Sequence, residues 1–499
     1  MGQAQSTAGV QTPDWVGNEA TETKYEKSAY DLLKSLSFAE DDQGFVYREL
    51  TIKSIKRWEE QFLAEPKNLL ALAAVSKNDM KQIIQQPNAI IDDAQVFSDQ
   101  IAFDGAPITN QRSSGRCWIF AATSVLRVYL MKKDKLEKAN FFLERMQKFP
   151  VLDTLSITKS ETNDTGPIEI IDTSEEPLDS RVVDELLKIP VNDGGQWDMI
   201  INLVERYGVV PQKLYPDTYN SMNSRGVNAL VTSKLREFAL QLRAMSSSGL
   251  SPHAIQRAKS KMVNTIYNIL VTCFGPPPKP DETFTWEFRD SLGKFHSYPN
   301  ITPINFFKDF IGYKAASHFS LINDPRHEYG KLYTVSRLNN VFGGKPIRYV
   351  NVDMATMKAA IVAMIKKDHP VFFGCDVGKF SDSKLGIMDT KLFDYKLAFD
   401  TELGLNKAGR LLVGESRMTH AMTLNGVHIV DGKSVKWKVQ NSWGEGSGEK
   451  GWFVMTDGWM DEYCYQAVVG PDFVSQEIRD ILKQEPTALP LWDPIGALA

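Results

Sequence analysis

The chain has 499 residues, of which 42% are hydrophobic and 24% charged, and its formal net charge is −5. This composition is typical of a soluble globular protein with two or three domains, or with one domain that carries a large insertion. The acidic balance gives no overall basic signature for nucleic-acid binding, and no stretch approaches the ~20 apolar residues of a membrane span.

The first residues show no targeting features apart from one short pattern. They lack the basic start and apolar core of a secretory signal, and Asp14 and Glu19 precede the first arginine, Arg48, which argues against a transit peptide. The opening MGQAQS fits the N-myristoylation pattern at Gly2, with a plain mobile tail over residues 1–25 as the alternative. We therefore expect a cytoplasmic protein without a membrane span, and the N-terminal composition does not support a mitochondrial pool.

The predicted elements divide the chain into an α-rich first part and a β-rich last part that bracket a helical insertion. Apolar residues at helical spacing predict an N-terminal helical part and an α-rich lobe over 26–220. Two long helical patterns, broken by GPPPKP, predict the insertion over 221–345. Strand-type composition with turn residues predicts a β-rich lobe over 346–485, and a C-terminal arm covers 486–499. This order indicates an α+β fold.

Two of the predicted helices follow loops that contain polar or glycine residues. One begins at Cys117, after the loop GAPITNQRSSGR, and runs to about Met131. The other follows NDGGQ and ends near Gly208, with Pro211 just beyond. The four cysteines are far apart and show neither a CxxC pair nor metal-ligand spacing, so we expect reduced thiols and neither a metal nor a cofactor.

Cys117 stands where the glycine-rich loop meets an apolar helix. A free thiol has a pKa near ~8.5, and the unpaired N–H groups and dipole of a helix N-terminus favour its thiolate. A nucleophilic role is therefore one interpretation of Cys117. An inert core cysteine is the alternative, since free cysteines are commonly buried.

Three other residues could complete an acyl-transfer site. Gln111, on the same loop, could donate to a developing oxyanion together with the backbone N–H of Cys117. His420 begins a probable strand, and Asn441 follows 21 residues later, where its side-chain oxygen could hold the imidazole in one tautomer. Trp443 could cover that hydrogen bond from water. Taken singly, His420 could be an ordinary core or surface histidine and Asn441 a turn residue.

The stretches NQRSSGRCWIF, THAMTLNGV and QNSWGEGSGEKGWFVM resemble the three active-site motifs of papain-like cysteine peptidases. The resemblance implies a two-lobed fold, with an α-rich lobe and a β-barrel-like lobe. It also implies that Cys117 is the nucleophile, His420 the base and acid, Asn441 the residue that orients the imidazole, and Gln111 the oxyanion donor.

A fourth stretch, NDGGQWDMI, resembles the papain-like segment whose glycines pair with an extended substrate. The resemblance implies that Gly194 and Gly195 bind substrate, and an ordinary turn is the alternative.

The chain is most similar to the bleomycin hydrolase branch of these peptidases. Cys117 and His420 are 420 − 117 = 303 residues apart, and the helical insertion accounts for the excess over the ≈ 130–150 residues of ordinary papain-like enzymes. INDPRHEYGKLYTVSRLNN, GESRMTHAMT and LWDPIGALA carry the similarity from about Tyr30 to Ala499. Ser114 occupies the position where secreted papain-like enzymes carry a disulfide cysteine.

This resemblance implies a homohexamer whose C-terminal arm, ending at Ala499, lies in the substrate cleft. The enzyme would then remove residues from peptides with free N-termini, because a fixed carboxylate pairs with the substrate ammonium. A frayed terminus is the alternative for the arm. The family also hydrolyses bleomycin and homocysteine thiolactone, both by acyl transfer, and requires no metal.

Two other functions stay open at this point. A nucleic-acid-binding hexamer with secondary peptidase activity would use the local basic clusters KKDK (132–135) and RAKSK (257–261), although solvated helix faces explain these as well. A pseudoenzyme scaffold is disfavoured because every acyl-transfer group is present.

Overall fold

The computed structural model describes residues 51–105, 107–133, 176–191, 193–341 and 344–498. The predicted tail over 1–25, including Gly2, and the terminal Ala499 lie outside the described residues. The chain forms two compact units, one of residues 1–83 with 398–400 and the other of 84–397 with 401–499. Helices α2 (Ile52–Ala64), α3 (Pro66–Val75) and α4 (Met80–Ile83) belong to the first unit.

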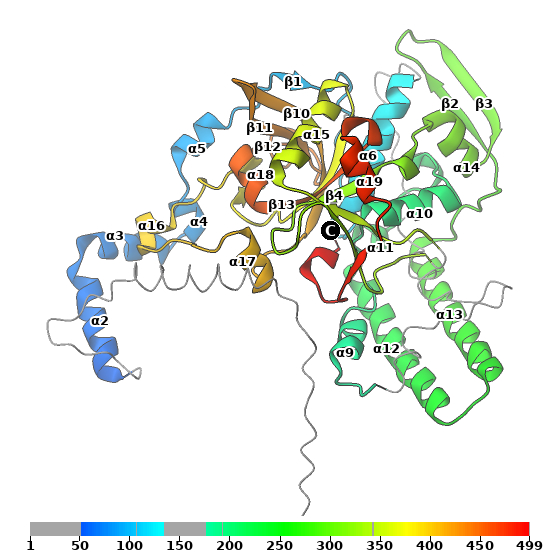
Figure 1. Ribbon diagram of the computed structural model, residues 1–499, viewed down its shortest axis with the longest axis horizontal. Helices are drawn as coiled ribbons and strands as arrows, with labels where there is room; N and C mark the ends of the chain where they lie inside the picture. Colours follow the sequence, from blue (N-terminus) through cyan, green and yellow to red (C-terminus); the bar gives the residue numbers. More distant parts are fainter. Residues whose placement is uncertain (1–50, 106, 134–175, 192, 342–343, 499) are drawn as a thin grey trace, which may run out of the picture. The chain divides into compact units, whose positions relative to one another are not determined.

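The second unit is built around one twelve-stranded sheet (Figure 1). Its strand order is β14-β5-β6-β4-β13-β7-β10-β11-β12-β9-β8, and β1 pairs with β10. The strands are β1 (Asp99–Gln100), β4 (Phe319–Ile322), β5 (Lys331–Val335), β6 (Tyr349–Asn351), β7 (Val371–Cys375), β8 (Ser381–Asp382), β9 (Ile387–Met388), β10 (His420–Val430), β11 (Lys433–Gln440), β12 (Trp452–Thr456), β13 (Cys464–Val469) and β14 (Thr487–Leu489). The sheet is open at β14 and β8, so the expected barrel-like lobe is not a closed barrel.

The sheet begins earlier in the chain than the sequence predicts. β4 and β5 lie before residue 346, inside the range predicted to be a helical insertion. A separate hairpin, β2 (Phe284–Arg289) with β3 (Phe295–Ile301), lies there too and projects from the rest of the unit (Figure 1). The four residues of β4 are all buried, and so short an apolar run cannot be distinguished from a buried helix by periodicity alone.

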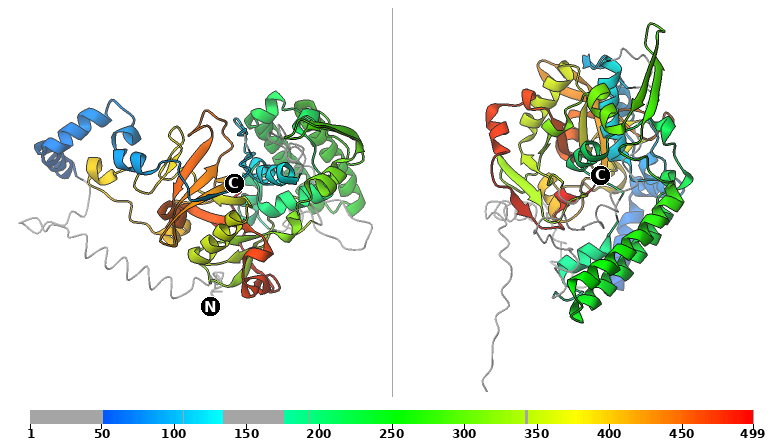
Figure 2. Two further views of the ribbon diagram at one scale, coloured as in Figure 1. Left: turned by 90° about the horizontal axis from the view of Figure 1, so that it is seen from above. Right: turned by 90° about the vertical axis from the view of Figure 1, so that its right-hand side faces the viewer.

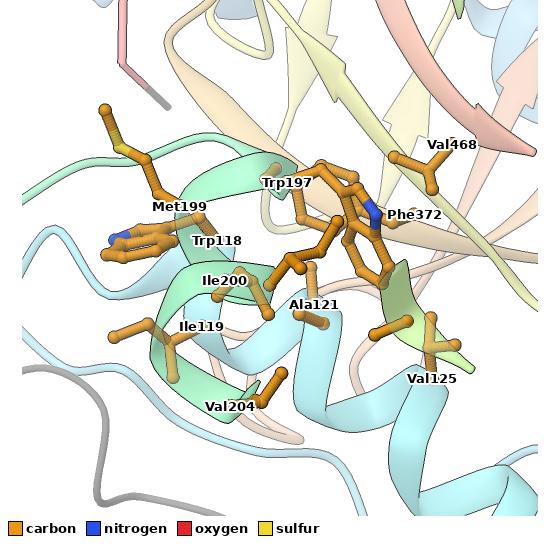
Figure 3. Packing of buried hydrophobic residues seen from close by; sticks show 14 of the residues in the cluster. Trp118, Ile119, Ala121, Val125, Trp197, Met199, Ile200, Val204, Phe372 and Val468 are labelled. Atoms are coloured by element: carbon orange, nitrogen blue, oxygen red, sulfur yellow. The ribbon is translucent and has the colours of Figure 1, made fainter. Parts of the chain in front are cut away.

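Helix α6 (Cys117–Lys133) is the central helix of the unit, and nearly all its residues to Met131 are buried. A helix that is apolar all round needs partners on every side. Against it packs α10 (Trp197–Tyr207), and Trp197 also lies over Phe372 of β7, with ring centroids 5.5 Å apart. Figure 3 shows this cluster, in which each fully buried large apolar side chain contributes about 1.5–3 kcal/mol.

The predicted insertion contains a pair of long helices, α12 (Arg225–Ser247) and α13 (Pro252–Phe274), which lie side by side in both figures (Figures 1 and 2). Ser251 caps α13 by accepting from the Ala254 N–H, and Gly275 ends it. Buried apolar residues at helical spacing hold the pair together, among them Val231, Leu235, Ile266 and Leu270. These two helices confirm the long helical patterns of the sequence.

The remaining helices are shorter. They are α5 (Pro87–Asp92), α9 (Arg181–Lys188), α11 (Tyr219–Met222), α14 (Pro303–Asn305), the π-helix η3 (Phe306–Ile311), α15 (Met354–Lys366), α16 (Tyr395–Phe399), α17 (Lys407–Leu412), α18 (Asp457–Tyr463), α19 (Gln476–Ile481) and the 3-10 turns η2 (Gln212–Leu214), η4 (Ala315–Ser317), η5 (Pro471–Phe473) and η6 (Pro494–Gly496). Within the described ranges, no helix has the length and apolar character needed to cross a bilayer.

Gly208 ends α10, as the sequence predicts, and its backbone has a φ of +66°. A Cβ at this position would lie 2.2 Å from the carbonyl carbon and oxygen of Pro303. Only glycine therefore lets the chain turn here and approach the start of α14 so closely.

We predict that Gly208→Ala lowers the free energy of unfolding by about 2–4 kcal/mol, because it adds a backbone clash to the strain of a positive φ. Urea unfolding measures this loss. Gly249→Ala is the matched control, since Gly249 has a φ of +70° but nothing within 4 Å of a Cβ, and it should lose about 1 kcal/mol. Equal losses in the two variants would contradict the clash.

Candidate active site

A tightly bonded loop places Cys117 as the first residue of α6. The backbone N–H of Gly115 donates to Asp193 Oδ2 at 2.7 Å, and a Cβ on Gly115 would lie only 2.4 Å from Asp193 Oδ1. The next residue, Arg116, is buried and forms an ion pair with Asp217. The loop thus reaches the helix in one fixed conformation, which puts the sulfur at the helix N-terminus.

His420 and Asn441 form the hydrogen bond that the sequence predicts. His420 Nε2 lies 2.9 Å from Asn441 Oδ1, which also accepts the backbone N–H of Ser442 at 2.7 Å. Because a backbone N–H can only donate, the second bond fixes the oxygen of the amide toward the imidazole. Nε2 then carries the proton, and Nδ1 is left as the basic nitrogen. The ring of Trp443 covers this pair, with its centroid 4.8 Å from that of His420.

A hydrogen bond joins α6, which begins at Cys117, to β10, which begins at His420. Thr423 Oγ1, three residues after His420 in β10, donates to the carbonyl of Ala121, one turn after Cys117 in α6, at 3.2 Å. The backbone N–H of Ala421 also acts on the thiol, where it favours the thiolate. The sheet and the helix therefore bring Cys117 and His420 together although 303 residues separate them in the sequence.

The amide of Gln111 is held in a single orientation. Its Oε1 accepts from Ser442 Oγ at 2.6 Å, and its Nε2 donates to the carbonyl of Ser114 at 2.7 Å. A primary amide carries two N–H groups, so one remains to donate to an oxyanion. The backbone N–H of Gln111 donates to the Ser442 carbonyl at 2.8 Å, which ties the loop to the residue after Asn441.

Burial shifts the pKa values of Cys117 and His420 in opposite directions. Cys117 is 2% and His420 4% exposed. Loss of solvent raises the pKa of Cys117 to about 11, against the lowering effect of the Ala421 and Trp118 N–H groups. Burial also lowers the pKa of His420 to about 4, although its bond to Asn441 opposes this.

The sequence alone predicts a thiol pKa lowered by the helix N-terminus, and the structure corrects that prediction. Desolvation outweighs the helix effect because the sulfur has almost no contact with water. Burial thus disfavours the charged form of each group when it is considered alone. A thiolate and an imidazolium side by side would titrate as a coupled pair.

The two glycines predicted to bind substrate have different surroundings. Gly194 lines the cavity beside Trp118. Gly195 faces the Trp118 indole, and a Cβ there would lie 2.4 Å from the ring. The indole N–H in turn donates to the Asp193 carbonyl at 2.8 Å. Close packing thus requires glycine at 195, whereas Gly194 is the one whose backbone adjoins the cavity.

The C-terminal segment forms part of the wall of this cavity, whose volume is about 690 Å³. β14 pairs in parallel with β5, and the chain then turns through η6. Ala497 and Leu498 line the cavity together with Trp118 and Gly194. The carbonyl of Ala497 accepts from Gln196 Nε2 at 2.7 Å.

Among the described residues, one group could offer ligands to a metal ion. Oxygen or nitrogen atoms of Asp324, His327 and Asp493 lie within 4.8 Å of one another. Arg326 already occupies the space between the carboxylates, with Nη2 2.7 Å from Asp324 and 2.8 Å from Asp493. A guanidinium there repels a cation, so the cluster is an ion-pair network. All four cysteines are free thiols.

Residues 49–496 match the model of the peptidase C1-like family. The chain belongs to this family. The family is one of cysteine-type peptidases, and the residues brought together at the tip of α6 agree with it.

The matches to three named relatives extend over most of this chain and of each relative. This chain is 40% identical to mouse bleomycin hydrolase over 444 residues, and the match covers 87% of this chain and 96% of the relative. It is 40% identical to aminopeptidase C of Streptococcus thermophilus, with 85% and 94% covered. Yeast cysteine proteinase 1, mitochondrial, is 36% identical, with 90% and 93% covered. The resemblance to the bleomycin hydrolase branch is confirmed.

The crystal structure of PepW from Lactobacillus rhamnosis has the same fold. It superposes with a TM-score of 0.85 at 38% identity and covers 91% of this chain and 100% of that one. The predicted α+β, papain-like class is therefore confirmed.

Three residues that support the site do not stand out in the sequence. Ser442 orients Gln111, Asp193 holds the loop before α6, and Gln196 holds the C-terminal segment. Ser442 adjoins Asn441 in the motif QNSWG and could have been found there. The partners of Asp193 and Gln196 are distant in sequence, so no local pattern reveals them.

We predict that His420→Gln removes part of the acid sensitivity of the fold. The folded pKa of His420 is about 4, below its ordinary 6.5, so the unfolded chain takes up a proton first as the pH falls. Stability is fully present above pH 6.5 and is lost progressively toward pH 4. Between these values the wild-type chain should lose about 3 kcal/mol more than the variant.

Chemical denaturation at a series of pH values measures this difference. His253→Gln serves as the control, because its side chain is exposed on α13, and it should leave the pH dependence of the wild-type chain unchanged. If His420→Gln and the wild-type chain have the same pH slope, His420 is not buried as described.

Proposed function

We propose that this chain is a cysteine aminopeptidase of the bleomycin hydrolase type, which removes N-terminal residues from peptides through an acyl-enzyme. The catalytic residues are Cys117, His420 and Asn441, and Gln111 is the oxyanion donor. The geometry at the tip of α6 supports the first part of the proposal, because the Asn441 bond leaves Nδ1 of His420 for proton exchange with the thiol.

The observation that carries the aminopeptidase assignment is the position of the C-terminal segment. Ala497 and Leu498 line the same cavity as Trp118, the residue after the nucleophile, and Gly194. A substrate that pairs with Gly194 therefore meets the chain end within the cavity. The carboxylate of Ala499 would pair with its α-ammonium, and longer peptides could not extend past it.

The reaction proceeds through two acyl transfers. The Cys117 sulfur, giving its proton to His420, forms a bond to the scissile carbonyl carbon, and the oxygen takes the negative charge. The second N–H of Gln111 and the N–H of Cys117 hold that oxyanion. His420 then protonates the nitrogen as the C–N bond breaks. Water adds to the thioester while His420 takes its proton, the C–S bond breaks, and the free acid leaves.

The names of the relatives and the acyl-transfer chemistry support a class of substrates for this proposal. Peptides with free N-termini are the main substrates. Bleomycin and homocysteine thiolactone are further proposed substrates, since the first offers an amide and the second a thioester to the same acyl-transfer groups. The mouse relative carries the name bleomycin hydrolase and the Streptococcus thermophilus relative the name aminopeptidase C.

Self-association as a homohexamer is part of the proposal. In the first unit, helices α2 and α3 expose large apolar side chains, with Ile52 76% and Leu70 73% exposed. Such a surface on a soluble chain usually belongs to an interface. We place the protein in the cytoplasm because its four thiols are free, although the yeast relative carries the word mitochondrial in its name.

The alternative of a nucleic-acid-binding ring finds little support in the basic clusters. Lys132 is paired with Asp368 at 2.8 Å, and Lys259 is only 4% exposed. Lysines engaged in this way are poorly placed to contact phosphate. Binding to DNA that weakens steeply with added salt would favour the alternative.

We predict that Cys117→Ala lowers turnover of a peptide reporter with a free N-terminus by more than about a thousandfold, because no acyl-enzyme can form. The N-acetylated form of the same reporter should be a poor substrate for the wild-type chain. Cys273→Ala, on α13 and only partly buried, should keep full activity. Residual turnover by Cys117→Ala at the wild-type rate would refute the assignment of the nucleophile.

A further inference from the structure

The C-terminal segment is attached to the wall of the cavity by a buried ion pair. Asp493 Oδ1 lies 2.8 Å from Arg326 Nη2, and the side chains of Arg326 and Asp493 are 7% and 9% exposed. Arg326 is itself held by Asp324, whose carboxylate is fully buried. Because the buried carboxylate of Asp324 fixes one side of the Arg326 guanidinium, the guanidinium can hold the carboxylate of Asp493 rigidly on its other side.

From this anchor the chain turns directly toward the active site. Asp493 also accepts the backbone N–H of Ile495 at 2.9 Å, and that bond starts the turn η6. Ile495 is 2% exposed within the core cluster of α6 and α10. A Cβ on Gly496 would lie 2.9 Å from Val335, so the segment passes close against β5.

Gln196 holds the segment at Ala497, and the placement of its side chain is unusual. It is the N-cap residue of α10, yet its side chain makes no cap hydrogen bond. Its amide is fully buried and donates instead to the carbonyl of Ala497. Its Oε1 has no hydrogen-bond partner.

A buried amide with an unsatisfied acceptor is costly, and an apolar side chain would fill the same space without that cost. Removal of the C-terminal segment would leave both ends of the Gln196 amide without a partner. We therefore infer that the amide of Gln196 serves to hold Ala497 through this single hydrogen bond.

We propose that Gln196 and the Arg326–Asp493 ion pair are specificity-determining residues, which together set how far the chain end reaches along the cleft. The ion pair fixes where the segment leaves the wall, and the amide holds Ala497, which lines the cavity together with Gly194. These positioning residues decide how many substrate residues fit upstream of the cut. The inference rests on the aminopeptidase function proposed above.

The test compares a free and an N-acetylated peptide reporter of the same sequence in the full-length chain. Gln196→Met keeps the volume and burial of the side chain but removes the donor to Ala497. Asp493→Asn removes the negative charge that pairs with Arg326 but keeps an oxygen that can accept from Ile495. Each variant should raise the ratio of N-acetylated to free turnover about tenfold, the factor expected for one buried polar contact.

Matched controls separate this effect from general disturbance. Gln484→Met removes an exposed glutamine amide that donates to the Gly330 carbonyl, and Asp480→Asn removes a surface ion pair with Lys483. Both should leave the ratio at the wild-type value. Hydrogen exchange of residues 494–498 should accelerate in the two test variants and stay unchanged in the controls.

The outcomes are distinguishable. An unchanged ratio in Asp493→Asn, with the variant folded and active on the free reporter, overturns the proposal, and it does so even if Gln196→Met does not fold. A wild-type chain that cleaves no free reporter in a Cys117-dependent manner refutes the proposed function instead. Faster exchange over 494–498 without any change in the ratio also overturns the proposal, because the segment then moves without affecting specificity.

Discussion

The contact between helix α6 and strand β10 is the constraint on which the rest of the site depends. It holds the first residue of the helix, Cys117, beside the first residue of the strand, His420, and the bond from Thr423 to Ala121 fixes their register. Apolar packing around α6 stabilises this contact, since nearly the whole helix is buried. The insertion of α12 and α13 lengthens the sequence between the two residues without changing where they meet.

The burial that holds the site together also sets its chemistry. Burial raises the pKa of the Cys117 thiol and lowers the pKa of the His420 imidazole, so the charged form of each group alone is disfavoured. In the proposed mechanism, proton transfer between them creates the thiolate and imidazolium at once, and each charge then stabilises the other. The hydrogen bond to Asn441 fixes the tautomer in which His420 can accept that proton. The same exclusion of water would favour the proposed oxyanion contacts of Gln111.

The proposed catalytic residues stand out in the sequence, whereas their supporting contacts do not. Cys117, His420, Asn441 and Gln111 lie in local motifs that indicate acyl-transfer chemistry, and the structure shows the predicted bond between His420 and Asn441. Long helices such as α12 and α13 were also predictable, because their apolar spacing extends over many turns. By contrast, the short strands β4 and β5 have too few residues for a period to show. The contacts of Gln196 with Ala497 and of Arg326 with Asp493 join positions far apart in sequence, and the raised pKa of Cys117 follows from burial, which no local pattern specifies.

The pH dependence of Cys117 alkylation tests the coupled pair most directly. The rate would be followed by mass spectrometry of the Cys117 peptide in the wild-type chain and in His420→Gln. The account predicts a rate in the wild-type chain that changes little between about pH 6 and 8, because the imidazole supplies the thiolate. In the variant the rate should rise about tenfold per pH unit over that range, as for a lone buried thiol. Identical profiles in the two proteins would contradict the account.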